Sequence, residues 1–395
     1  MGGCGVRTLY PQPCVGGGVS SACLSILRGA VSAGFDVSLH TARIDVARPA
    51  GMASHAALPG WTRHVGHRLM RHLSEPLLYS RYLSSLSDGD VAYAWPGTPL
   101  WLLERLHARG IPIAVESINT LMSWARPVLD AAYDALGLVP AHGITDARIA
   151  DQQARYALAT TIFAPSPATE AALAGTPFAA SAVPASYGTW VPETLPERAR
   201  MAAGRVNVLF AGNVCVRKGA HVVLGLWRDM PAHVHLRLVG EIEPGLRRRF
   251  ADVLDRPNVS WAGYTTRMRD EYTAADLSLL PSLEEGDPLV TYESAAHAVP
   301  MIATPMGAGR LGAEAGVVTT LASSDPEELR NRILGLAADA ELRRAMGDAA
   351  RAAVFDYDWA KVGRRRFQHM ARLLEPAPAY AGPRWVQPRL SAKFA

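Results

Sequence analysis

The stretch LSLLPSLEEGDPLVTYESAAHAVPMIAT, residues 277–304, carries a candidate strand at each end and a helix-length segment between them. Leu277–Leu280 and Met301–Thr304 are short apolar runs of the length typical of buried strands. Asp287 followed by Pro288 is typical of a helix start, with Asp as the N-cap residue and Pro in the first helical position. Strand, helix and strand in this order predict one unit of a parallel sheet.

The same alternation continues on both sides of this stretch. Further candidate strands in the first half are Val6–Tyr10, Phe35–His40, Val91–Ala94, Pro112–Glu116 and Thr160–Pro165. Those in the second half are Val206–Ala211, Val234–Val239, Val259–Trp261 and Val317–Thr319. Helix-length segments lie between them, among them Ser20–Ala33, His221–Arg228 and Pro244–Leu254. This pattern predicts parallel sheets with helices on both faces.

Between Gly175 and Gly204 the alternation gives way to four prolines and scattered glycines, a composition typical of a linker. We therefore predict two doubly wound α/β domains of similar size, one on each side of this linker. A chain of 395 residues is also longer than one hydrophobic core usually supports. Ligands of doubly wound sheets bind beyond the carboxyl ends of the strands, so we expect a site in the cleft between the domains.

The overall composition is that of an ordinary globular protein, with 49% hydrophobic and 19% charged residues. The net charge of +4 is slight for this length, and the basic triplets Arg247–Arg249 and Arg364–Arg366 are not interleaved with aromatic residues. We interpret both triplets as solvated faces and expect no nucleic-acid partner. Small anionic partners such as phosphates stay open.

The four cysteines, Cys4, Cys14, Cys23 and Cys215, have neither metal-binding nor paired spacing. We expect reduced thiols, which suit the cytoplasm. The N-terminus lacks a basic segment followed by an apolar one, and the sequence has no stretch of eighteen apolar residues. A cytoplasmic protein without a membrane-spanning segment is therefore expected.

Residues 56–86 interrupt the alternation of the first domain. Basic residues gather toward one side of the helix expected here, while Val65, Leu69, Leu73 and Leu77 recur toward another. The basic set comprises His64, His67, Arg68, Arg71 and His72. The segment is either an amphipathic helix packed on the domain or an element that docks on a membrane surface or an acceptor. A metal site is disfavoured, since no carboxylate or thiolate lies at ligand spacing beside the histidines.

The stretch FAGNVCVRKGAHVVL, residues 210–224, predicts a strand that runs into a glycine-containing loop and then a helix. Gly212 and Lys218 match the spacing of a P-loop. Arg217, however, stands where that motif has its second glycine, and Gly219 stands where it has a serine or threonine, which excludes a nucleoside triphosphatase loop. Arg217 and Lys218 beside a helix N-terminus are suited to a diphosphate, and the alternative is a solvated basic turn.

Near the N-terminus, CVGGGVSSA, residues 14–22, places Gly16, Gly17 and Gly18 directly before the first expected helix. Glycines let backbone N–H groups approach a ligand closely, although a tight turn without a ligand would use them equally. Ser21 stands where the dinucleotide-binding fingerprint has its last glycine. A nicotinamide-dependent enzyme is therefore disfavoured.

Glu285 and Glu293 lie on the two sides of the expected helix start. Glu285 falls in the loop before the helix, and Glu293 lies about one and a half turns inside it. The free N–H groups of Leu289 and Val290 lie near both. The residues alone leave four interpretations of this pair: surface charges, metal ligands, an acid/base pair, or groups that bind hydroxyls.

Residues 280–309 read LPSLEEGDPLVTYESAAHAVPMIATPMGAG. A proline-serine pair is followed by a glutamate, seven residues and a second glutamate, and then by an alanine-rich helix and a proline-turn-glycine. Flanking segments of interest are GGGVSSACLSILRGAVSAGFDVSLHT, FAGNVCVRKG, VSWAGYTTRMRDEYTAADLSLLPS and AMGDAARAAVFDYDWAKVGRRR. Over nearly its whole length the chain resembles the retaining family 4 glycosyltransferases of the GT-B fold (glycosyl transferases group 1), which have these motifs in this order.

This resemblance implies a GT-B fold, in which two Rossmann-like domains face each other across a deep cleft. Residues 1–190 would then bind the acceptor, and residues 191–355 would bind a nucleotide-sugar donor. Residues 356–395 would be a C-terminal helix, opened by Trp359, and a tail that crosses back onto the first domain.

The resemblance also implies roles for the matching residues. The implied catalytic residues are Arg217, Lys218 and Glu285, the first two neutralising the leaving diphosphate and the third binding the donor sugar. The implied donor-binding residues are Gly17, Gly18, Gly212, Tyr264, Thr265, Glu285, Gly286, Leu289, Val290 and Glu293. Among these, Glu293 would bind the ribose hydroxyls, and Tyr264 with Thr265 would lie near the base.

Three positions depart from the family pattern. Asn119 stands near the place of a histidine that contacts the donor sugar, Asn213 replaces an arginine, and Ala308 replaces the second glycine of a pair. Asn119 can still hydrogen-bond a sugar or an acceptor, so we interpret this change as tuning the donor preference.

The function implied is transfer of a sugar, with retention, from a nucleoside-diphosphate sugar to a hydroxyl of a glycan, a lipid-linked saccharide or a natural product. No metal and no cofactor are expected, because Arg217 and Lys218 would supply the positive charge. Residues 56–86 would allow peripheral contact with the inner membrane face. The alternatives are a nucleotide-sugar epimerase, phosphorylase or hydrolase of the same fold, and a non-catalytic nucleotide-sugar-binding partner.

Overall fold

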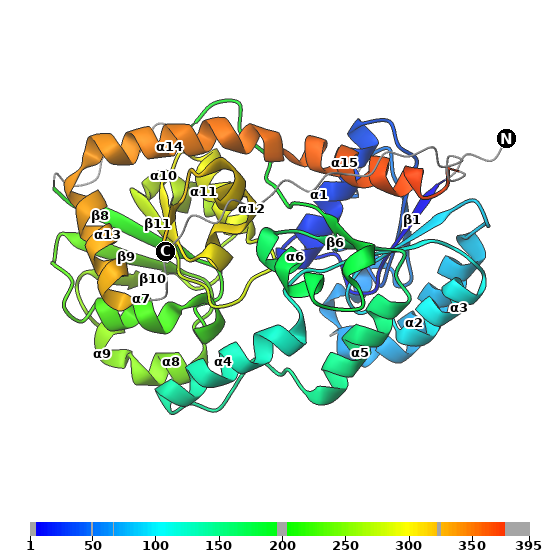
Figure 1. The fold of residues 1–395 in the computed structure, drawn as a ribbon, viewed down its shortest axis with the longest axis horizontal. Helices are drawn as coiled ribbons and strands as arrows, with labels where there is room; N and C mark the ends of the chain where they lie inside the picture. Colours follow the sequence, from blue (N-terminus) through cyan, green and yellow to red (C-terminus); the bar gives the residue numbers. More distant parts are fainter. Residues whose placement is uncertain (1–4, 49, 66, 196–203, 322–324, 376–395) are drawn as a thin grey trace.

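The computed structural model describes residues 5–48, 50–65, 67–195, 204–321 and 325–375. It divides the chain into two domains, each built on one parallel sheet with helices packed on its faces (Figure 1). The α/β class and the two-sheet architecture predicted from the sequence are confirmed.

The first sheet has seven parallel strands in the order β3-β2-β1-β4-β5-β6-β7. Its strands are β1 (Val6–Tyr10), β2 (Val37–Thr41), β3 (Ala53–Ala56), β4 (Val91–Ala94), β5 (Ile113–Glu116), β6 (Thr161–Ala164) and β7 (Ala182–Pro184). The helices of this domain are α1 (Gly18–Ser32), α2 (His67–Ser85), α3 (Leu100–Ala108), α4 (Met122–Leu136), α5 (Asp146–Ala157) and α6 (Pro167–Ala174), with short 3-10 turns η1 (Gly60–His64) and η2 (Ala179–Ser181). The central strands β4 and β5 are buried at every position because helices cover both faces of the sheet.

The second sheet has six parallel strands in the order β10-β9-β8-β11-β12-β13. Its strands are β8 (Val206–Ala211), β9 (Val234–Val239), β10 (Val259–Trp261), β11 (Leu277–Leu280), β12 (Met301–Ala303) and β13 (Thr319–Thr320). Its helices are α7 (Ala220–Leu226), α8 (Pro244–Arg249), α9 (Ala251–Leu254), α10 (Met268–Ala274), α11 (Leu289–Ala296), α12 (Pro305–Ala315), α13 (Pro326–Ala338) and α14 (Ala340–Val354), with the 3-10 turn η3 (Val216–Lys218). The turn η4 (Phe355–Tyr357) and the helix α15 (Trp359–Arg372) follow.

The strand order of each sheet reverses at one point, between β1 and β4 in the first domain and between β8 and β11 in the second. Loops that leave neighbouring strands at such a point diverge to opposite faces and open a crevice between them. The loop after β8 carries Arg217 and Lys218, and the loop after β11 carries Glu285. The topology thus brings the basic loop and the acidic loop to the same edge of the second sheet.

Most strands expected from the sequence are present within a residue or two of the expected bounds, but two were missed. β3 and β7 lie at the two edges of the first sheet and are short. β7 belongs to the segment Gly175–Gly204, so this segment is not only a linker. Pro184 at the end of β7 is compatible with an edge strand because one side of an edge strand needs no ladder hydrogen bonds.

The helix α15 lies on the first domain, although α14 directly before it covers the second (Figure 1). It packs closely along α1 through two glycines. A Cβ atom on Gly29 would lie 2.0 Å from the carbonyl oxygen of Trp359, and one on Gly363 would lie 2.3 Å from that of Ile26. The helix that begins at Trp359 thus lies against α1, while residues 376–395 of the expected tail lie outside the described residues.

A buried ion pair also fixes α15 to the first sheet, so the expectation of a solvated face is wrong for Arg366 of the triplet Arg364–Arg366. Nε and Nη2 of Arg366 donate to the two carboxylate oxygens of Glu116, at 2.8 and 3.1 Å. The hydroxyls of Tyr93 and Tyr187 donate to the same carboxylate. Because every oxygen of the carboxylate has donors, the charge of Glu116 is tolerated at the end of β5.

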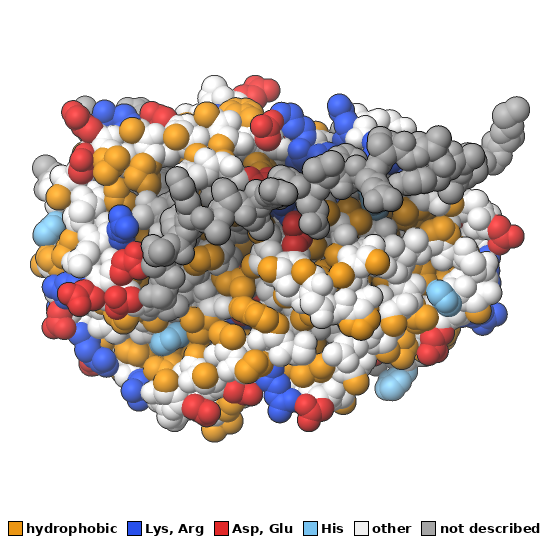
Figure 2. Space-filling view, viewed as in Figure 1, with side chains coloured by type: hydrophobic (Ala, Val, Ile, Leu, Met, Phe, Trp, Pro, Cys, Tyr) orange, Lys and Arg blue, Asp and Glu red, His pale blue; other side chains and the backbone are white. Residues whose placement is uncertain are grey.

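The apolar core is continuous across the domain junction. One cluster joins Leu27 of α1 and Phe367 of α15 with Tyr292 of α11 and Val354 of α14. A second cluster, around Trp227, belongs mainly to the second domain. On the face shown in Figure 2, charged side chains lie mainly around the rim and hydrophobic side chains extend across the middle.

The helix expected in residues 56–86 is α2, but its apolar side does not pack on the domain as an ordinary amphipathic helix would. The side chains of Leu69 and Leu73 are 78% and 66% exposed. The buried side of α2 instead carries Leu78, Tyr79 and Tyr82. The side chains of His67 and Arg68 lie outside the described residues. The helical spacing of the leucines therefore did not identify the buried side of α2. That side is the one on which Tyr79 and Tyr82 bury their rings.

Candidate active site

The basic loop after β8 and the carboxylate of Glu285 form a compact charged cluster. Lys218 Nζ lies 2.6 Å from Glu285 Oε1, and Arg217 Nη1 lies 2.9 Å from Glu285 Oε2. The hydroxyl of Ser282 donates to Glu285 Oε1 at 3.2 Å. Gly212 lies against the side chain of Lys218, since a Cβ there would be 3.3 Å from Lys218 Cε. The structure thus brings together the three residues expected to be catalytic.

The two cations determine the charge state of Glu285. Burial alone would raise the pKa of this carboxyl, but the charges and hydrogen bonds of Lys218 and Arg217 outweigh burial and lower the pKa to about 2. The charge of Glu285 in turn raises the pKa of Arg217. Glu285 and Arg217 are therefore both ionised at neutral pH.

The loop backbone is shaped by glycine. Gly219 lies between η3 and α7 in the left-handed region, with φ of 71°. A Cβ on Gly219 would lie 2.0 Å from the carbonyl oxygen of Pro281, in the loop after β11. Only glycine therefore lets the two loops approach closely enough for Lys218 to reach Glu285.

Glu293 lies within α11 and is not part of the charged cluster. It accepts a hydrogen bond of 2.7 Å from the hydroxyl of Tyr272. Burial raises the pKa of Glu293, while the Tyr272 hydroxyl and the charge of Lys218 act in the opposite direction. Leu289 and Val290 begin α11 between the two glutamates, and the first N–H groups of a helix have no partner within it.

Asp287 does not cap α11, contrary to the expectation from the Asp-Pro pair. The helix begins at Leu289 with Pro288 as its N-cap residue. The Asp287 carboxylate accepts hydrogen bonds from the hydroxyl of Tyr292 at 2.6 Å and from the backbone N–H groups of Tyr187 and Arg310 at 2.7 and 2.9 Å. The residue joins the two domains instead, because a buried carboxylate bonds to whichever donors surround it.

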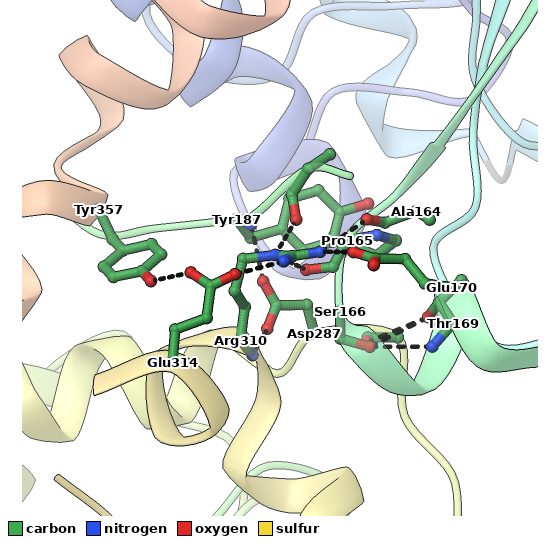
Figure 3. A network of polar contacts seen from close by, with 12 residues as sticks. Ala164, Pro165, Ser166, Thr169, Glu170, Tyr187, Asp287, Arg310, Glu314 and Tyr357 are labelled. Atoms are coloured by element: carbon green, nitrogen blue, oxygen red, sulfur yellow. Dashed lines mark hydrogen bonds and ion pairs between the residues drawn. The ribbon is translucent and has the colours of Figure 1, made fainter. Parts of the chain in front are cut away.

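Arg310 of α12 is the centre of the network that surrounds Asp287 (Figure 3). Its guanidinium donates to backbone carbonyls of the first domain, those of Ala164, Pro165 and Ala185. It also pairs with Glu170 of α6 and with Glu314 of its own helix. The five N–H donors of arginine suit this role, and the contacts fix the second domain against the carboxyl end of β6.

Asn119 lies in the loop after β5, but its side chain does not stand free toward the cleft. Its Nδ2 donates to Glu284 Oε2 at 2.8 Å. Both residues line the interdomain cavity described below. The side-chain oxygen of Asn119 is the part of this amide that the contact with Glu284 leaves for a ligand.

The glycine-rich loop before α1 faces the second domain. A Cβ on Gly17 would lie 3.7 Å from the hydroxyl of Tyr264, which is itself 72% exposed. Gly18 follows with φ of 53° and begins α1. The structure therefore brings Gly17 and Tyr264 together, while Thr265 accepts a hydrogen bond from the N–H of Arg267.

A cavity of about 960 Å³ lies between the two domains. Its walls in the first domain include Trp95, Ile118, Asn119, Met122, Tyr133, Gln152 and Tyr156. Its walls in the second domain include Asn213, Cys215, Arg217, Glu243 and Glu284. Among the described residues, α2 contributes nothing to this lining. Arg217, one of the two cations of the charged cluster, is thus part of the cavity wall.

Two kinds of site residue were not found from the sequence. Tyr272 holds Glu293, and Glu284, Asp287 and Arg310 join the domains. Glu284 stands next to Glu285 in the sequence, but the sequence does not show that its side chain points toward the first domain. That orientation depends on contacts with Asn119 and Thr120, more than a hundred residues away. In the described part of the chain, no three His, Cys, Asp or Glu side chains gather as a metal site would require.

The fold is shared with several solved structures of low sequence identity. WaaG, a glycosyltransferase involved in lipopolysaccharide biosynthesis, is 15% identical with a TM-score of 0.66, over 94% of this chain and 99% of that chain. The sucrose-phosphate synthase of Thermosynechococcus elongatus is 18% identical with a TM-score of 0.73, over the same shares of the two chains, 94% and 99%. Anabaena Alr3699/HepE, in complex with UDP and glucose, is 15% identical with a TM-score of 0.63, over 93% and 100%.

These likenesses span both domains, so the architecture is that of the GT-B glycosyltransferases. The family model for Glycosyl transferases group 1 matches residues 205–339, which hold the second sheet and the charged cluster. Residues 205–339 thus belong to the Glycosyl transferases group 1 family, as the sequence motifs indicated. None of the curated protein sequences is similar enough to this chain to count as a match.

Proposed function

We propose that this protein is a retaining glycosyltransferase that moves a sugar from a nucleoside-diphosphate sugar to a hydroxyl group. The observation that carries the proposal is the contact of Lys218 and Arg217 with Glu285, in the loops at the switch point of the second sheet. Two fixed cations beside a carboxylate suit a ligand with a diphosphate at one end and a hydroxyl-rich sugar at the other.

The donor would lie along the second domain. Glu285 accepts hydrogen bonds from the sugar, and Glu293 accepts them from the ribose hydroxyls. Gly17 and Gly18 admit the diphosphate from the other side of the cleft, and Tyr264 lies near the base. The UDP, and the UDP-glucose, found in structures of Anabaena Alr3699/HepE support a nucleotide-sugar donor here.

Departure of the diphosphate is the step that the cations assist. As the bond between the anomeric carbon and the phosphate oxygen breaks, negative charge grows on that oxygen. Arg217 and Lys218 stabilise this charge without reorganisation because Glu285 already holds them in place. The departing oxygen takes the proton of the acceptor hydroxyl, and attack from the same face gives retention. The two cations supply the charge that a metal would otherwise supply.

The acceptor would enter the cavity of about 960 Å³, which Arg217 helps to line. The carboxyl ends of β4 and β5 and the helices α4 and α5 of the first domain form most of its walls. Aromatic and aliphatic side chains, including Trp95, Met122 and Tyr156, line it together with polar groups. Such a lining suits the sugar or the apolar aglycone of a small acceptor.

A panel of nucleoside diphosphates and their sugars, tested by thermal shift, identifies the donor, since a ligand that binds the folded state raises the Tm. The donor is then incubated with candidate acceptors, and mass spectrometry follows the products. We expect transfer, with the anomeric configuration kept in the NMR spectrum of the product and with full activity in EDTA. Product from the donor alone would indicate an epimerase or hydrolase, and binding without turnover would indicate a non-catalytic partner.

We also propose that η1 and α2 dock on an anionic membrane surface. Trp61, Leu69 and Leu73 are exposed on this segment, and Arg63 and Arg71 lie among them. Apolar side chains flanked by basic ones are typical of helices that lie in a membrane interface. None of the helices in the described part of the chain combines the length and hydropathy needed to span a bilayer. In a flotation assay with vesicles that contain anionic lipid, the wild type should rise with the vesicles, and a Leu69→Ser/Leu73→Ser variant should stay in the bottom fraction.

A further inference from the structure

Glu284 precedes Glu285 in the loop after β11, but it faces the first domain. Its Oε1 accepts hydrogen bonds from the backbone N–H and the hydroxyl of Thr120, at 2.9 and 2.8 Å. Its Oε2 accepts one from Nδ2 of Asn119 at 2.8 Å. The residue is only 2% exposed, so these donors replace water around a buried charge.

The loop residues on either side of Glu285 also contact the first domain. A Cβ on Gly286 would lie 2.2 Å from the carbonyl oxygen of Ile118, and the carbonyl oxygen of Gly286 accepts a hydrogen bond from the hydroxyl of Thr169. The carboxylate of Asp287 accepts a hydrogen bond from the backbone N–H of Tyr187. The loop that holds the catalytic carboxylate is therefore attached to the other domain at each neighbouring residue.

Arg217 lies between the two adjacent glutamates. Its Nη1 lies 2.9 Å from Glu285 Oε2, 3.0 Å from the backbone oxygen of Glu284 and 3.6 Å from Glu284 Oε2. If the first domain moved away, the Glu284 carboxylate would lose three donors and Arg217 would be the nearest cation left to it. The guanidinium would then be drawn toward Glu284 and away from Glu285, because a buried charge without partners is costly.

We propose that Glu284 is a positioning residue that couples closure of the cleft to the placement of Arg217. In the closed form Asn119 and Thr120 donate hydrogen bonds to the Glu284 carboxylate. Arg217 then stays beside Glu285, where it neutralises the leaving diphosphate. In the open form Glu284 competes for Arg217. The donor bond is thus activated only when the acceptor-binding domain is in place, which limits hydrolysis of the donor by water. This inference rests on the proposed function for the role of Arg217.

The test compares Glu284→Ala and Asn119→Ala with the wild type, and with Glu341→Gln, on the exposed side of α14, as a control. We expect both variants to bind UDP, measured by calorimetry, within a few fold of the wild type. Their kcat for transfer should fall by roughly tenfold or more, the size expected when a hydrogen bond to a charged group is lost. Donor hydrolysis relative to transfer should rise in Glu284→Ala, because no carboxylate then draws Arg217 away in the open form, but not in Asn119→Ala, where Glu284 still competes for Arg217. The radius of gyration from X-ray scattering should increase in both.

A reciprocal swap separates this role from a merely structural one. Asn119→Asp alone places two carboxylates against each other, and Glu284→Gln alone places two amides against each other, so each should lower kcat. The double variant E284Q/N119D restores one donor and one acceptor with the direction of the hydrogen bond reversed. We expect it to recover most of the lost kcat and the compact radius.

Two results would overturn the inference: a Glu284→Ala variant with unchanged kcat and radius, or a double variant no better than either single one. If Glu284→Ala does not fold, Thr120→Val removes one of the same hydrogen bonds from the other domain and serves in its place. A wild type that binds no nucleotide sugar would contradict the proposed function instead. The radii of the unliganded variants would then still test whether Glu284 holds the cleft closed.

Discussion

Arg366 and Glu116 lie 250 residues apart in the sequence and meet as a two-point ion pair with both side chains buried. The pair joins the helix α15 to the carboxyl end of β5, directly before the loop that carries Asn119. The C-terminal helix is therefore part of the scaffold that positions the acceptor-side loop of the cleft.

Loss of one partner of this pair should destabilise the protein strongly. Arg366→Met leaves the Glu116 carboxylate buried without its cation, at a cost of about 3–5 kcal/mol in the free energy of unfolding. Arg364→Met, on the exposed side of the same helix, should cost almost nothing. Urea unfolding followed by circular dichroism measures both. Equal effects of the two variants would show that the ion pair does not stabilise the domain.

Removal of Lys218 should slow transfer without unfolding the protein. Lys218→Met deletes one of the two cations beside Glu285, and loss of one preorganised donor typically costs about 3 kcal/mol of transition-state stabilisation, or a 100-fold to 1,000-fold fall in kcat. Lys361→Met, at an exposed pair with Asp356, is the matched control and should keep full activity. The assay is initial-rate kinetics with a saturating acceptor. A Lys218→Met enzyme with wild-type kcat would remove this residue from the mechanism.

The stability supplied by Glu285 should depend on pH only under acidic conditions. Its pKa is lowered from 4.5 to about 2 in the folded protein, so the carboxylate stays ionised while the unfolded chain takes up a proton. The stabilisation is therefore complete above about pH 5 and is lost as the pH falls from 4.5 toward 2. The difference in unfolding free energy between the wild type and Glu285→Gln, measured from pH 7 to pH 3, should shrink below pH 4.5. A constant difference would show that the cations do not hold this charge.

A methyl group at position 286 should force the two domains apart. In Gly286→Ala the new Cβ would lie 2.2 Å from the carbonyl oxygen of Ile118, and relief of such overpacking typically costs 1–3 kcal/mol. Gly335→Ala places a methyl group in open space within α13 and should stabilise the protein by roughly 0.5–1 kcal/mol. Thermal unfolding and X-ray scattering distinguish them, since only the first should raise the radius of gyration. A compact and fully stable Gly286→Ala variant would contradict the close contact across the cleft.

The sequence was sufficient for the parts of the fold whose signal is local. Strands such as β4 and β12 are buried on both faces and appear as unbroken apolar runs, so their positions could be predicted. The contact of Lys218 with Glu285 could be expected as well, because each residue follows a central strand and the carboxyl ends of parallel strands meet at one edge. Local pattern and sheet geometry agree for these elements.

The remaining features depend on partners that are distant in the sequence. Asp287 has the local pattern of an N-cap, but the N–H groups of Tyr187 and Arg310 compete for its carboxylate. Leu69 has the spacing of a core residue but is exposed, since Tyr82 occupies the buried side of α2. The direction of Glu284 depends in the same way on the loop that carries Thr120. No local pattern reports such contacts.

The packing of α15 on α1 has a consequence for how this chain folds during synthesis. The first domain leaves the ribosome early, but the α1 surface around Gly29 stays uncovered and the carboxylate of Glu116 lacks its cation until Gly363 and Arg366 have also emerged. Domains usually complete their folding in the order in which they are made. Here the second domain can complete its folding first, because the N-terminal domain needs α15, the last helix of the described chain, to complete its own. Ribosome pausing before residue 359 would therefore prolong the exposure of the N-terminal domain to chaperones.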